Sequence, residues 1–179
     1  MELGVEEIAA LLVSPAAAQP VEAGAGYSHL DHARQTAAIL ASDPRNDEEL
    51  VVAGLVHDIG QLFAGVGDLG HAQAGEAGVR RVLGERVATL VGLHVEAKRY
   101  LSATVAYGEV LSPASVASLM VQGGPMTPAQ CVAFEALDEC GDAVSLRKAD
   151  DRAKVDDLVV ADLSHWLAMV RRVAVRAER

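Results

Sequence analysis

The stretch from Val51 to Gly60 constrains this chain most, because a nearly unbroken apolar run ends there in two adjacent ionisable residues, His57 and Asp58. A run that is apolar on every side predicts a central, buried helix, and Gly60 suits the left-handed conformation that closes a helix. Ionisable groups at the end of such a helix are costly unless they are paired or bind a metal ion. The two carboxylate oxygens of Asp58 can contact two cations. The stretch therefore predicts a metal site if other segments supply more ligands.

The composition favours a helical fold. Hydrophobic residues make up 51% of the 179 residues but aromatic residues only 3%, so the core must be built from Ala, Val and Leu. These residues suit close-packed helices better than a β-sandwich. No segment alternates as a strand would, and no internal repeat is present. We predict a single all-α domain over residues 1–179.

Capping residues, prolines and glycines divide the chain into helices. Ser28 and Asp31 predict a capping box, and Asn46 or Asp47 caps the central helix. Gly65 begins a G-x-G-x-x-G match, but a helix rather than a strand precedes it, so we expect a loop and not a dinucleotide site. The expected helices span residues 2–13, 28–42, 47–58, 71–83, 85–101, 142–155 and 162–176, with two more beginning at Pro113 and Pro128.

The charge and the apolar pattern exclude several functions. A formal net charge of −10 argues against nucleic acid as a partner, although a few local cations could still hold a small anion. No apolar run reaches the roughly 18 residues that a membrane span needs, and the acidic start is unlike a signal peptide. Cys131 and Cys140 make no disulfide framework and fit a reducing compartment. We therefore expect a cytoplasmic protein without a nucleic-acid or membrane partner.

Further imidazole and carboxylate groups stand on other predicted helices. Imidazole with carboxylate suits iron, manganese or zinc, and an aspartate with histidines on both sides suits a two-metal centre. Each histidine by itself is more often a structural residue than a ligand, so the pattern gains weight only as a set. The additional candidate ligands are His32, His71, His94 and either Asp150 or Asp151.

Polar residues near these ligands predict an anion site. Lys98 follows His94 by one helical turn, and Arg147 precedes Asp150 by three residues. A polar stripe on an otherwise apolar helix is formed at positions i, i+3 and i+7 by Ser115, Ser118 and Gln122. The alternatives are solvated surface charges for the two cations and a small-residue helix contact for the two serines. A cationic, hydrogen-bonding pocket beside the metals would orient a phosphonate or phosphate group.

The sequence resembles the HD-domain superfamily of metal-dependent phosphohydrolases. Because it also has His71 and His94, it is similar to the HD-domain di-iron oxygenases of phosphonate breakdown, which are distant relatives of myo-inositol oxygenase. The resemblance runs from about residue 28 to residue 155. It rests on Leu30-Asp-His32, His57-Asp-Ile-Gly60, Leu93–Leu101, Leu111–Val116, Gln122–Met126 and Leu146–Asp151.

The resemblance implies a helical bundle with a two-metal site in its core and a role for each candidate. One metal would be held by His32, His57, Asp58 and Asp150, and the other by Asp58, His71 and His94. The catalytic residues would be Asp58 and Lys98. The phosphonate would be held by Lys98, Ser115, Ser118, Gln122 and Arg147. The implied cofactor is a mixed-valent Fe(II)/Fe(III) pair, with manganese or zinc as the alternative.

Three positions depart from the pattern of the family members that cleave aminophosphonates. Glu22 and Ala25 stand where those members carry a tyrosine and a glutamate, and Tyr27 lies close by but out of register. Gln61 replaces a histidine that often follows the His-Asp-Ile-Gly stretch. We therefore expect a substrate whose tail is not an aminoethyl group.

Three functions fit these residues. The first is a di-iron oxygenase that uses O2 to cleave the C–P bond of a small α-hydroxyphosphonate and release phosphate. The second is a phosphohydrolase that acts on a small phosphate monoester or nucleotide with hydroxide generated at the metals. The third is a non-catalytic metal- or ligand-binding module. The oxygenase is preferred to the phosphohydrolase because of the resemblance, since both reactions can use the same metal ligands.

Overall fold

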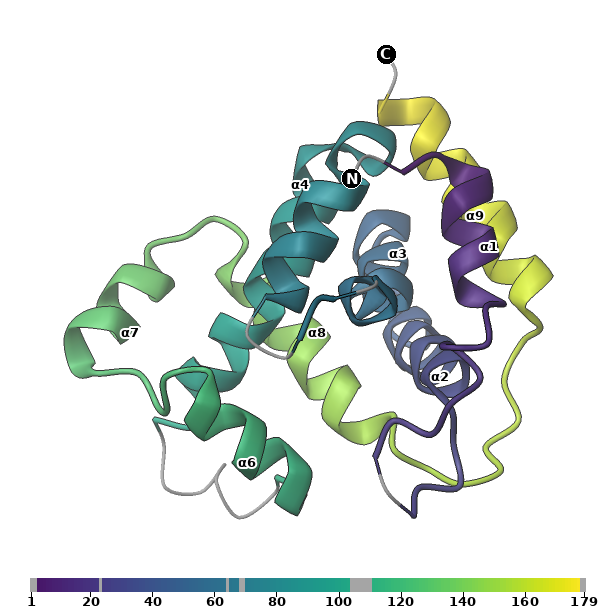
Figure 1. Cartoon of the computed structure of the whole chain (residues 1–179). Coiled ribbons are helices and arrows are strands. Elements are labelled where there is room, and N and C mark those ends of the chain that lie inside the picture. The colour runs from purple at the N-terminus through teal and green to yellow at the C-terminus, as the bar shows by residue number, and fades with distance from the viewer. Residues whose placement is uncertain (1–2, 23, 64, 68–69, 104–110, 178–179) are drawn as a thin grey trace.

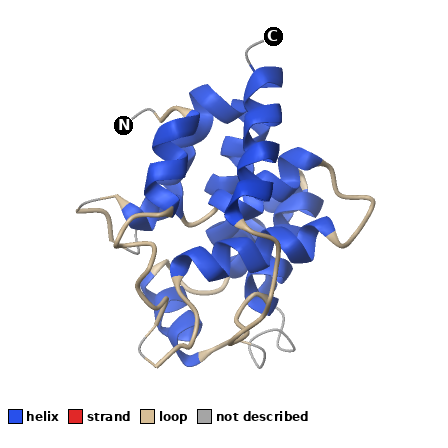
Figure 2. Ribbon diagram, turned by 90° about the vertical axis from the view of Figure 1, so that its right-hand side faces the viewer, coloured by secondary structure: helices blue, strands red, loops and turns tan. Residues whose placement is uncertain are grey.

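The computed structural model describes residues 3–22, 24–63, 65–67, 70–103 and 111–177. The regular structure in these ranges is helical, as Figure 2 shows, which confirms the predicted all-α fold. Parts of two predictions lie outside these ranges, namely Glu2 of the first helix and residues 68–69 of the glycine-rich loop. The elements are α1 (Val5–Leu12), α2 (His29–Ala41), α3 (Glu48–Val56), the 3-10 helix η1 (Ile59–Leu62), α4 (His71–Leu101), α6 (Pro113–Val121), α7 (Pro128–Glu135), α8 (Cys140–Arg152) and α9 (Leu163–Ala177).

The predicted caps begin the helices that they were expected to begin. The Ser28 hydroxyl accepts a hydrogen bond from the Asp31 amide, and the Asp31 carboxylate accepts one from the Ser28 amide. The Asp47 carboxylate accepts a hydrogen bond from the Leu50 amide at the start of α3. The same device, followed by proline, opens α6 and α7. Local side chains therefore satisfy amides that would otherwise lack partners at these helix ends.

The helix α4 is a hairpin of two helical halves. Gly84 has a φ of 87° in the middle of the element, a conformation that favours glycine. Beyond it the chain folds back, so that Gly75 faces Val91 and Gly92 faces Glu76. The predicted break at Gly84 is thus confirmed, and the two halves carry one histidine each toward the centre of the molecule.

The predicted central helix α3 forms the middle of the core. Every residue of it from Leu50 to Val56 is buried. Helices α2, α4, α8 and α9 pack around it, and α1 packs on α9, whereas α6 and α7 lie to one side of the bundle (Figure 1). None of the helices in the described ranges is long and apolar enough to cross a membrane. The arrangement brings the C-terminal end of α3 against α2, α4 and α8.

Gly60 does not adopt the expected left-handed conformation. It lies in η1, and its φ is not positive. A Cβ atom at this position would lie 2.0 Å from the carbonyl oxygen of His71 and 2.9 Å from the amide nitrogen of Gly75. Glycine is therefore needed because the backbones of η1 and α4 approach closely, not because a helix must be closed.

Arg86, in the second half of α4, joins this helix to α3 and α8. Its guanidinium donates to Asp47 at 2.9 Å, Glu49 at 2.7 Å and Asp142 at 2.7 Å. We expect Arg86→Met to lower the free energy of unfolding by about 1–2 kcal/mol, because a network of charges contributes more than an isolated surface pair. Urea denaturation measures this change. Arg45→Met, which breaks only a local pair with Asp43, should cost less than about 0.5 kcal/mol, and an equal cost for both variants would contradict the prediction.

Candidate metal centre

Four segments that are distant in sequence bring the candidate ligands together. The turn after α3 supplies His57 and Asp58, and the two halves of α4 supply His71 and His94. The other two, His32 and Asp150, come from α2 and α8. All of these side chains are buried except that of Asp58, which is 19% exposed.

Backbone carbonyl groups fix the orientation of three imidazole rings. The Nδ1 atom of His32 lies 2.7 Å from the carbonyl oxygen of Ala153, and the Nδ1 atom of His57 lies 2.8 Å from that of Gly54. The Nδ1 atom of His94 lies 2.6 Å from the carbonyl oxygen of Val91. A carbonyl oxygen only accepts hydrogen bonds, so each Nδ1 carries the proton and donates it. In the neutral form of each ring, Nε2 then has a lone pair that points toward the carboxylates, as metal-ligating histidines do.

Asp58 is shared by two clusters of possible ligands. Its Oδ2 atom lies 3.5 Å from Nε2 of His57 and 3.9 Å from Nε2 of His32. Its Oδ1 atom lies 3.4 Å from Nε2 of His71 and 3.5 Å from Nε2 of His94. Two atoms bound to one ion at about 2.1 Å, at angles of 90–120°, lie about 3.0–3.6 Å apart. Each cluster therefore has roughly the spacing that a single metal ion requires, with Asp58 between the two positions.

The donor atoms of the clusters repel one another unless a cation lies among them. Nε2 of His57 is buried and makes no hydrogen bond within the described part of the chain. Nε2 of His71 lies 3.0 Å from Nε2 of His94, and two imidazole nitrogens so close need a shared proton or a shared cation. Buried lone pairs directed at carboxylate oxygens are costly. The donor set thus fits two metal ions of the kind that imidazole and carboxylate prefer, such as iron, manganese or zinc.

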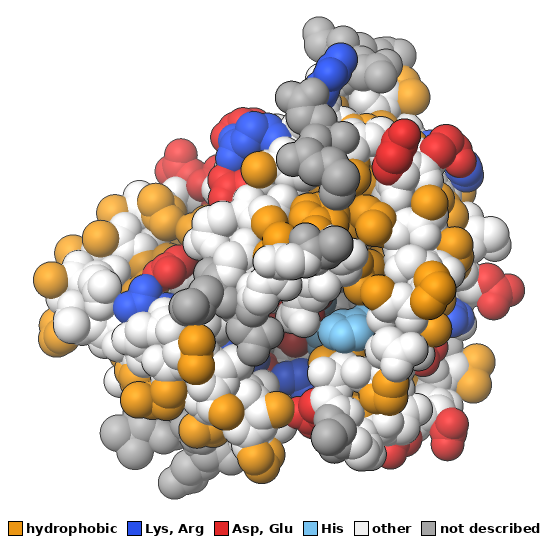
Figure 3. Space-filling model, viewed as in Figure 1, with side chains coloured by type: hydrophobic (Ala, Val, Ile, Leu, Met, Phe, Trp, Pro, Cys, Tyr) orange, Lys and Arg blue, Asp and Glu red, His pale blue; other side chains and the backbone are white. Residues whose placement is uncertain are grey.

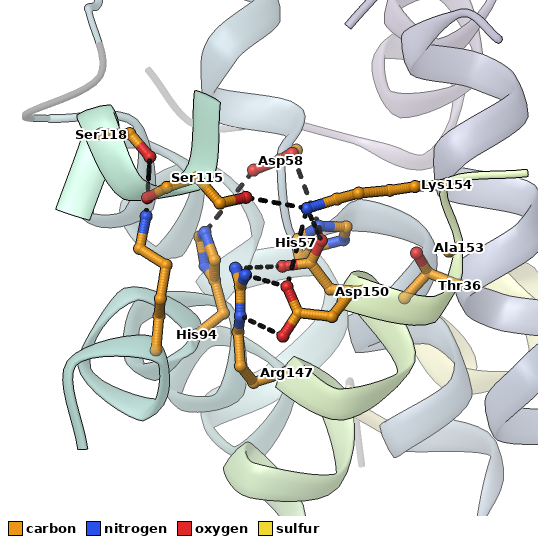
Figure 4. Close-up of polar contacts among 12 residues, drawn as sticks. Thr36, His57, Asp58, His94, Ser115, Ser118, Arg147, Asp150, Ala153 and Lys154 are labelled. Atoms are coloured by element: carbon orange, nitrogen blue, oxygen red, sulfur yellow. Dashed lines mark hydrogen bonds and ion pairs between the residues drawn. The ribbon is translucent and has the colours of Figure 1, made fainter. Parts of the chain in front are cut away.

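Asp150, and not Asp151, faces the histidines. Its Oδ1 atom lies 3.1 Å from Nε2 of His32 and 3.9 Å from Nε2 of His57. Its Oδ2 atom accepts a hydrogen bond of 2.5 Å from Arg147. Asp151 also pairs with Arg147 and lies near Lys154, so the spacing from Arg147 does not distinguish the two carboxylates. The distance to His32 does, and it adds Asp150, which lies beside Arg147 in Figure 4, to the first cluster.

At Asp58, Asp150 and His57 the surroundings favour the charge states that metal binding needs, whereas at His32 burial is outweighed by Asp150 and Asp58, which raise the pKa of the ring. Burial by itself would raise the pKa of Asp58, but His57, His71 and His94 lower that pKa well below its usual range. Burial would likewise raise the pKa of Asp150, and Arg147 and His32 lower it. Burial lowers the pKa of His57 to about 4. The carboxylates are therefore ionised and His57 is neutral near pH 7, as ligands to a divalent metal must be.

A cavity of about 150 Å³ opens onto the two clusters. It lies in the hollow of the face in Figure 3 where basic, acidic and histidine side chains meet. The ammonium group of Lys98 donates a hydrogen bond of 2.9 Å to the Ser118 hydroxyl. Burial, followed by the nearby charge of Arg147, lowers the pKa of Lys98 to about 8. The predicted anion-site residues all line the cavity: Lys98, Ser115, Ser118, Gln122 and Arg147.

The cavity also contains residues that the sequence did not point to. Lys154 lies two residues beyond the end of α8, although the predicted helix extended to residue 155 and would have placed it one turn after Asp150. Tyr27 is buried with its ring 6.3 Å from that of His32, although it is out of register with the family pattern. Glu22 and Gln61, two of the departures from that pattern, line the cavity, whereas Ala25 does not. The spacing of four residues from Asp150 was the available signal for Lys154.

Comparisons with known proteins agree with this geometry. The HD domain family matches residues 26–136, a range that ends before Asp150. The chain is 34% identical over 145 residues to (1-hydroxy-2-(trimethylamino)ethyl)phosphonate dioxygenase (glycine-betaine-forming) of Leisingera caerulea, covering 76% of this chain and 74% of the relative. It is 38% identical over 149 residues to hydroxymethylphosphonate dioxygenase of Gimesia maris, covering 78% and 74%. It is also 26% identical over 154 residues to the uncharacterized protein L432 of Acanthamoeba polyphaga mimivirus, covering 80% and 70%.

Proposed function

Because this chain belongs to the HD-domain family, we propose that it is a di-iron oxygenase that cleaves the C–P bond of a small α-hydroxyphosphonate with O2 and releases phosphate. The observation that carries the proposal is the position of Asp58, whose two oxygens face two histidine clusters at one end of a cavity that also contains Lys98. The two similar dioxygenases, both named for α-hydroxyphosphonates, support the reaction class.

In this proposal the two clusters hold two iron ions. His32, His57, Asp58 and Asp150 would hold the first ion, and Asp58, His71 and His94 the second. A mixed-valent iron pair at these positions would supply the redox chemistry with O2. The second position has fewer protein ligands, which leaves room there for the hydroxyl and phosphonate oxygens of the substrate.

The residues of the cavity would bind and orient the substrate. Lys98, Ser115 and Ser118 would bind the phosphonate oxygens, and Gln122 lies beside them. In the structure Lys98 donates to the Ser118 hydroxyl, which itself donates to the carbonyl of Ser115. Arg147 lines the same cavity and holds Oδ2 of Asp150, so it would also fix that ligand. The overall reaction balances, since an α-hydroxyphosphonate and O2 together contain the atoms of a carboxylic acid and phosphate. Carbon is oxidised and O2 is reduced, so no further reductant is needed.

The lining of the cavity supports a substrate whose tail is not an aminoethyl group. Gln61 lines the cavity in place of a histidine, and Glu22 lines it where those members carry a tyrosine. Ala25, at the register position of their glutamate, does not line the cavity. Rapid turnover of an aminoethylphosphonate, at rates typical of an efficient enzyme, would contradict this part of the proposal.

We expect kcat/KM for the phosphonate to fall as the pH rises through about 8, the pKa of Lys98. Burial favours the neutral amine, so the ammonium is present below this pH and is lost above it. A pH profile of kcat/KM at constant metal content measures the effect. Lys98→Arg should move the alkaline limb to higher pH, because arginine stays protonated. An alkaline limb that stays in place in this variant would rule out Lys98 as its source.

The proposal is tested with protein purified anaerobically with iron and partly reduced. Electron paramagnetic resonance and oxygen uptake are recorded while a panel of α-hydroxyphosphonates is added. The expected result is a mixed-valent di-iron signal that shifts with one compound, with O2 consumed and phosphate released. A silent spectrum without O2 uptake, together with phosphate release from monoesters under manganese or zinc, would replace the oxygenase by the phosphohydrolase.

A further inference from the structure

The loop of residues 153–162, which joins α8 to α9, runs along α2 (Figure 1). Nδ1 of His32 lies 2.7 Å from the carbonyl oxygen of Ala153, the first residue after α8. One turn further along the same face of α2, Gln35 binds Val155. A candidate metal ligand and a glutamine on one helix therefore contact the same short segment of chain, which lies 121 and 120 positions away from them.

The side-chain amide of Gln35 makes two hydrogen bonds to the backbone of one residue. Its Nε2 atom donates to the carbonyl oxygen of Val155 at 2.8 Å, and its Oε1 atom accepts from the amide of Val155 at 3.2 Å. Gln35 is 1% exposed, and a buried donor or acceptor is costly when its partner is lost. The two bonds need a donor and an acceptor on one uncharged side chain, which a glutamine supplies and a hydrophobic residue of similar length does not.

This loop in turn orients a candidate metal ligand. The Ala153 carbonyl accepts the Nδ1 proton of His32 and so directs Nε2 of that ring toward Asp150, 3.1 Å away. Ala153 lies between the last turn of α8, to which its amide donates, and Val155. The helix therefore fixes the chain on one side of the Ala153 carbonyl, and Gln35 fixes it on the other side.

Two other imidazole rings are oriented without a loop. The carbonyl groups that accept from Nδ1 of His57 and His94 belong to Gly54 and Val91, each of which lies three residues earlier on the same stretch of helix. The regular backbone of a helix holds such a carbonyl in place. His32 differs because its carbonyl partner lies outside any helix, so that a further contact is needed to fix it.

We infer that Gln35 is a positioning residue for the first metal position, because it holds the loop whose Ala153 carbonyl orients His32. The inference rests on the two-metal centre of the proposed function and not on the reaction. His71 and His94 of the second position come from the two halves of α4. Loss of the Gln35 contacts should therefore weaken metal binding at the first position and not at the second.

The test titrates the full chain, freed of metal by chelation, with Zn²⁺, and calorimetry gives a Kd for each position. Gln35→Met keeps the approximate length of the side chain and removes both hydrogen bonds. It should raise the Kd of the first position about 10- to 100-fold, the range for residues that orient a metal ligand, and leave that of the second unchanged. Circular dichroism checks that each variant remains helical.

Arg34→Met is the matched control. Arg34 also lies on α2 and binds the same loop, but farther along it, where its guanidinium donates to the carbonyls of Val160 and Ala161. Both Kd values should stay as in the wild type. Gln35→Asn is the second variant at the proposed position, because it keeps an amide that is one methylene too short for both bonds and disturbs the core less. It should weaken the same metal position.

Two backgrounds assign the affected position. In His71→Ala, which lacks a ligand of the second position, Gln35→Met should still weaken the Zn²⁺ binding that remains. In Asp150→Ala, which lacks a ligand of the first position, Gln35→Met should add little, since both changes act on one site.

The outcomes separate this inference from the proposed function. Weaker binding at the first position alone in Gln35→Met, with both Kd values unchanged in Arg34→Met, would support it. Equal weakening at both positions, no weakening, or an equal effect of Arg34→Met would overturn the role of Gln35 and leave the oxygenase proposal standing. A wild type that binds fewer than two Zn²⁺ ions would remove the two-metal centre and count against both.

Discussion

Replacing Asp58 by alanine should lower turnover of the phosphonate by at least about 10³-fold, or about 4 kcal/mol of transition-state stabilisation. Both oxygens of this one side chain face histidine nitrogens at 3.4–3.9 Å, so its removal takes a ligand from each cluster at once. The loss should exceed the 10- to 100-fold effect that is common for residues that only orient a ligand. Metal analysis of the purified variant and steady-state kinetics with added iron measure the two consequences.

The control for Asp58→Ala is Asp138→Ala. Asp138 is exposed between α7 and α8, so this variant loses a carboxylate without touching the cavity, and its metal content and turnover should match the wild type. Circular dichroism establishes that both variants remain helical. Full turnover with two bound metals in Asp58→Ala would contradict the shared-ligand arrangement.

Gly60→Ala should lower the free energy of unfolding by about 2–3 kcal/mol and reduce the metal content. The new methyl group would lie 2.0 Å from the His71 carbonyl oxygen and 2.8 Å from its carbon, and backbone atoms cannot rotate away as a flexible side chain can. The start of α4 must therefore move, and it takes the His71 ring away from Asp58. Thermal unfolding and metal analysis measure both effects, and a decrease of about 4–12 °C in Tm is expected for a chain of this size.

Gly141→Ala is the matched control for the change at Gly60. Gly141 lies in the first turn of α8, where a Cβ atom would meet nothing within 4 Å. Alanine there should be neutral or stabilise the protein by up to about 1 kcal/mol, because it lowers the entropy of the unfolded chain. Equal stability and equal metal content in the two variants would show that the close approach of η1 and α4 is unimportant.

The sequence predicts most of the helices because their ends are encoded locally. Ser28 and Asp47 cap the helices that they were expected to cap, α7 begins at Pro128 as predicted, and Gly84 breaks α4 at the predicted point. Gly60 was interpreted wrongly for a physical reason. A glycine needed for a left-handed conformation and one needed for a close backbone contact look identical in sequence, and only the tertiary structure distinguishes them.

The candidate site was predictable where helical spacing connects residues and not where tertiary contacts do. Lys98 follows His94 by one turn, and both line the cavity. Lys154 also follows Asp150 by four residues, but α8 ends at Arg152 and not at residue 155 as predicted, so the chain beyond the helix and the contact with Ser115 place Lys154 in the cavity. The choice between Asp150 and Asp151 likewise depended on His32, which lies on another helix and is more than a hundred positions away in the chain.

The hairpin of α4 lets one cluster form from a continuous part of the chain. Asp58, His71 and His94 lie on successive elements, and His32, His57 and Asp58 also precede α4. Of the candidate ligands, Asp150 comes from α8, and the hydrogen bond from His32 to Ala153 spans 121 positions. Because loop closure costs more entropy as the intervening chain lengthens, we expect the contacts among α2, the turn after α3 and α4 to form before those of α8. Asp58 would then have histidines on both sides early in folding, and the docking of α8 would add the last carboxylate.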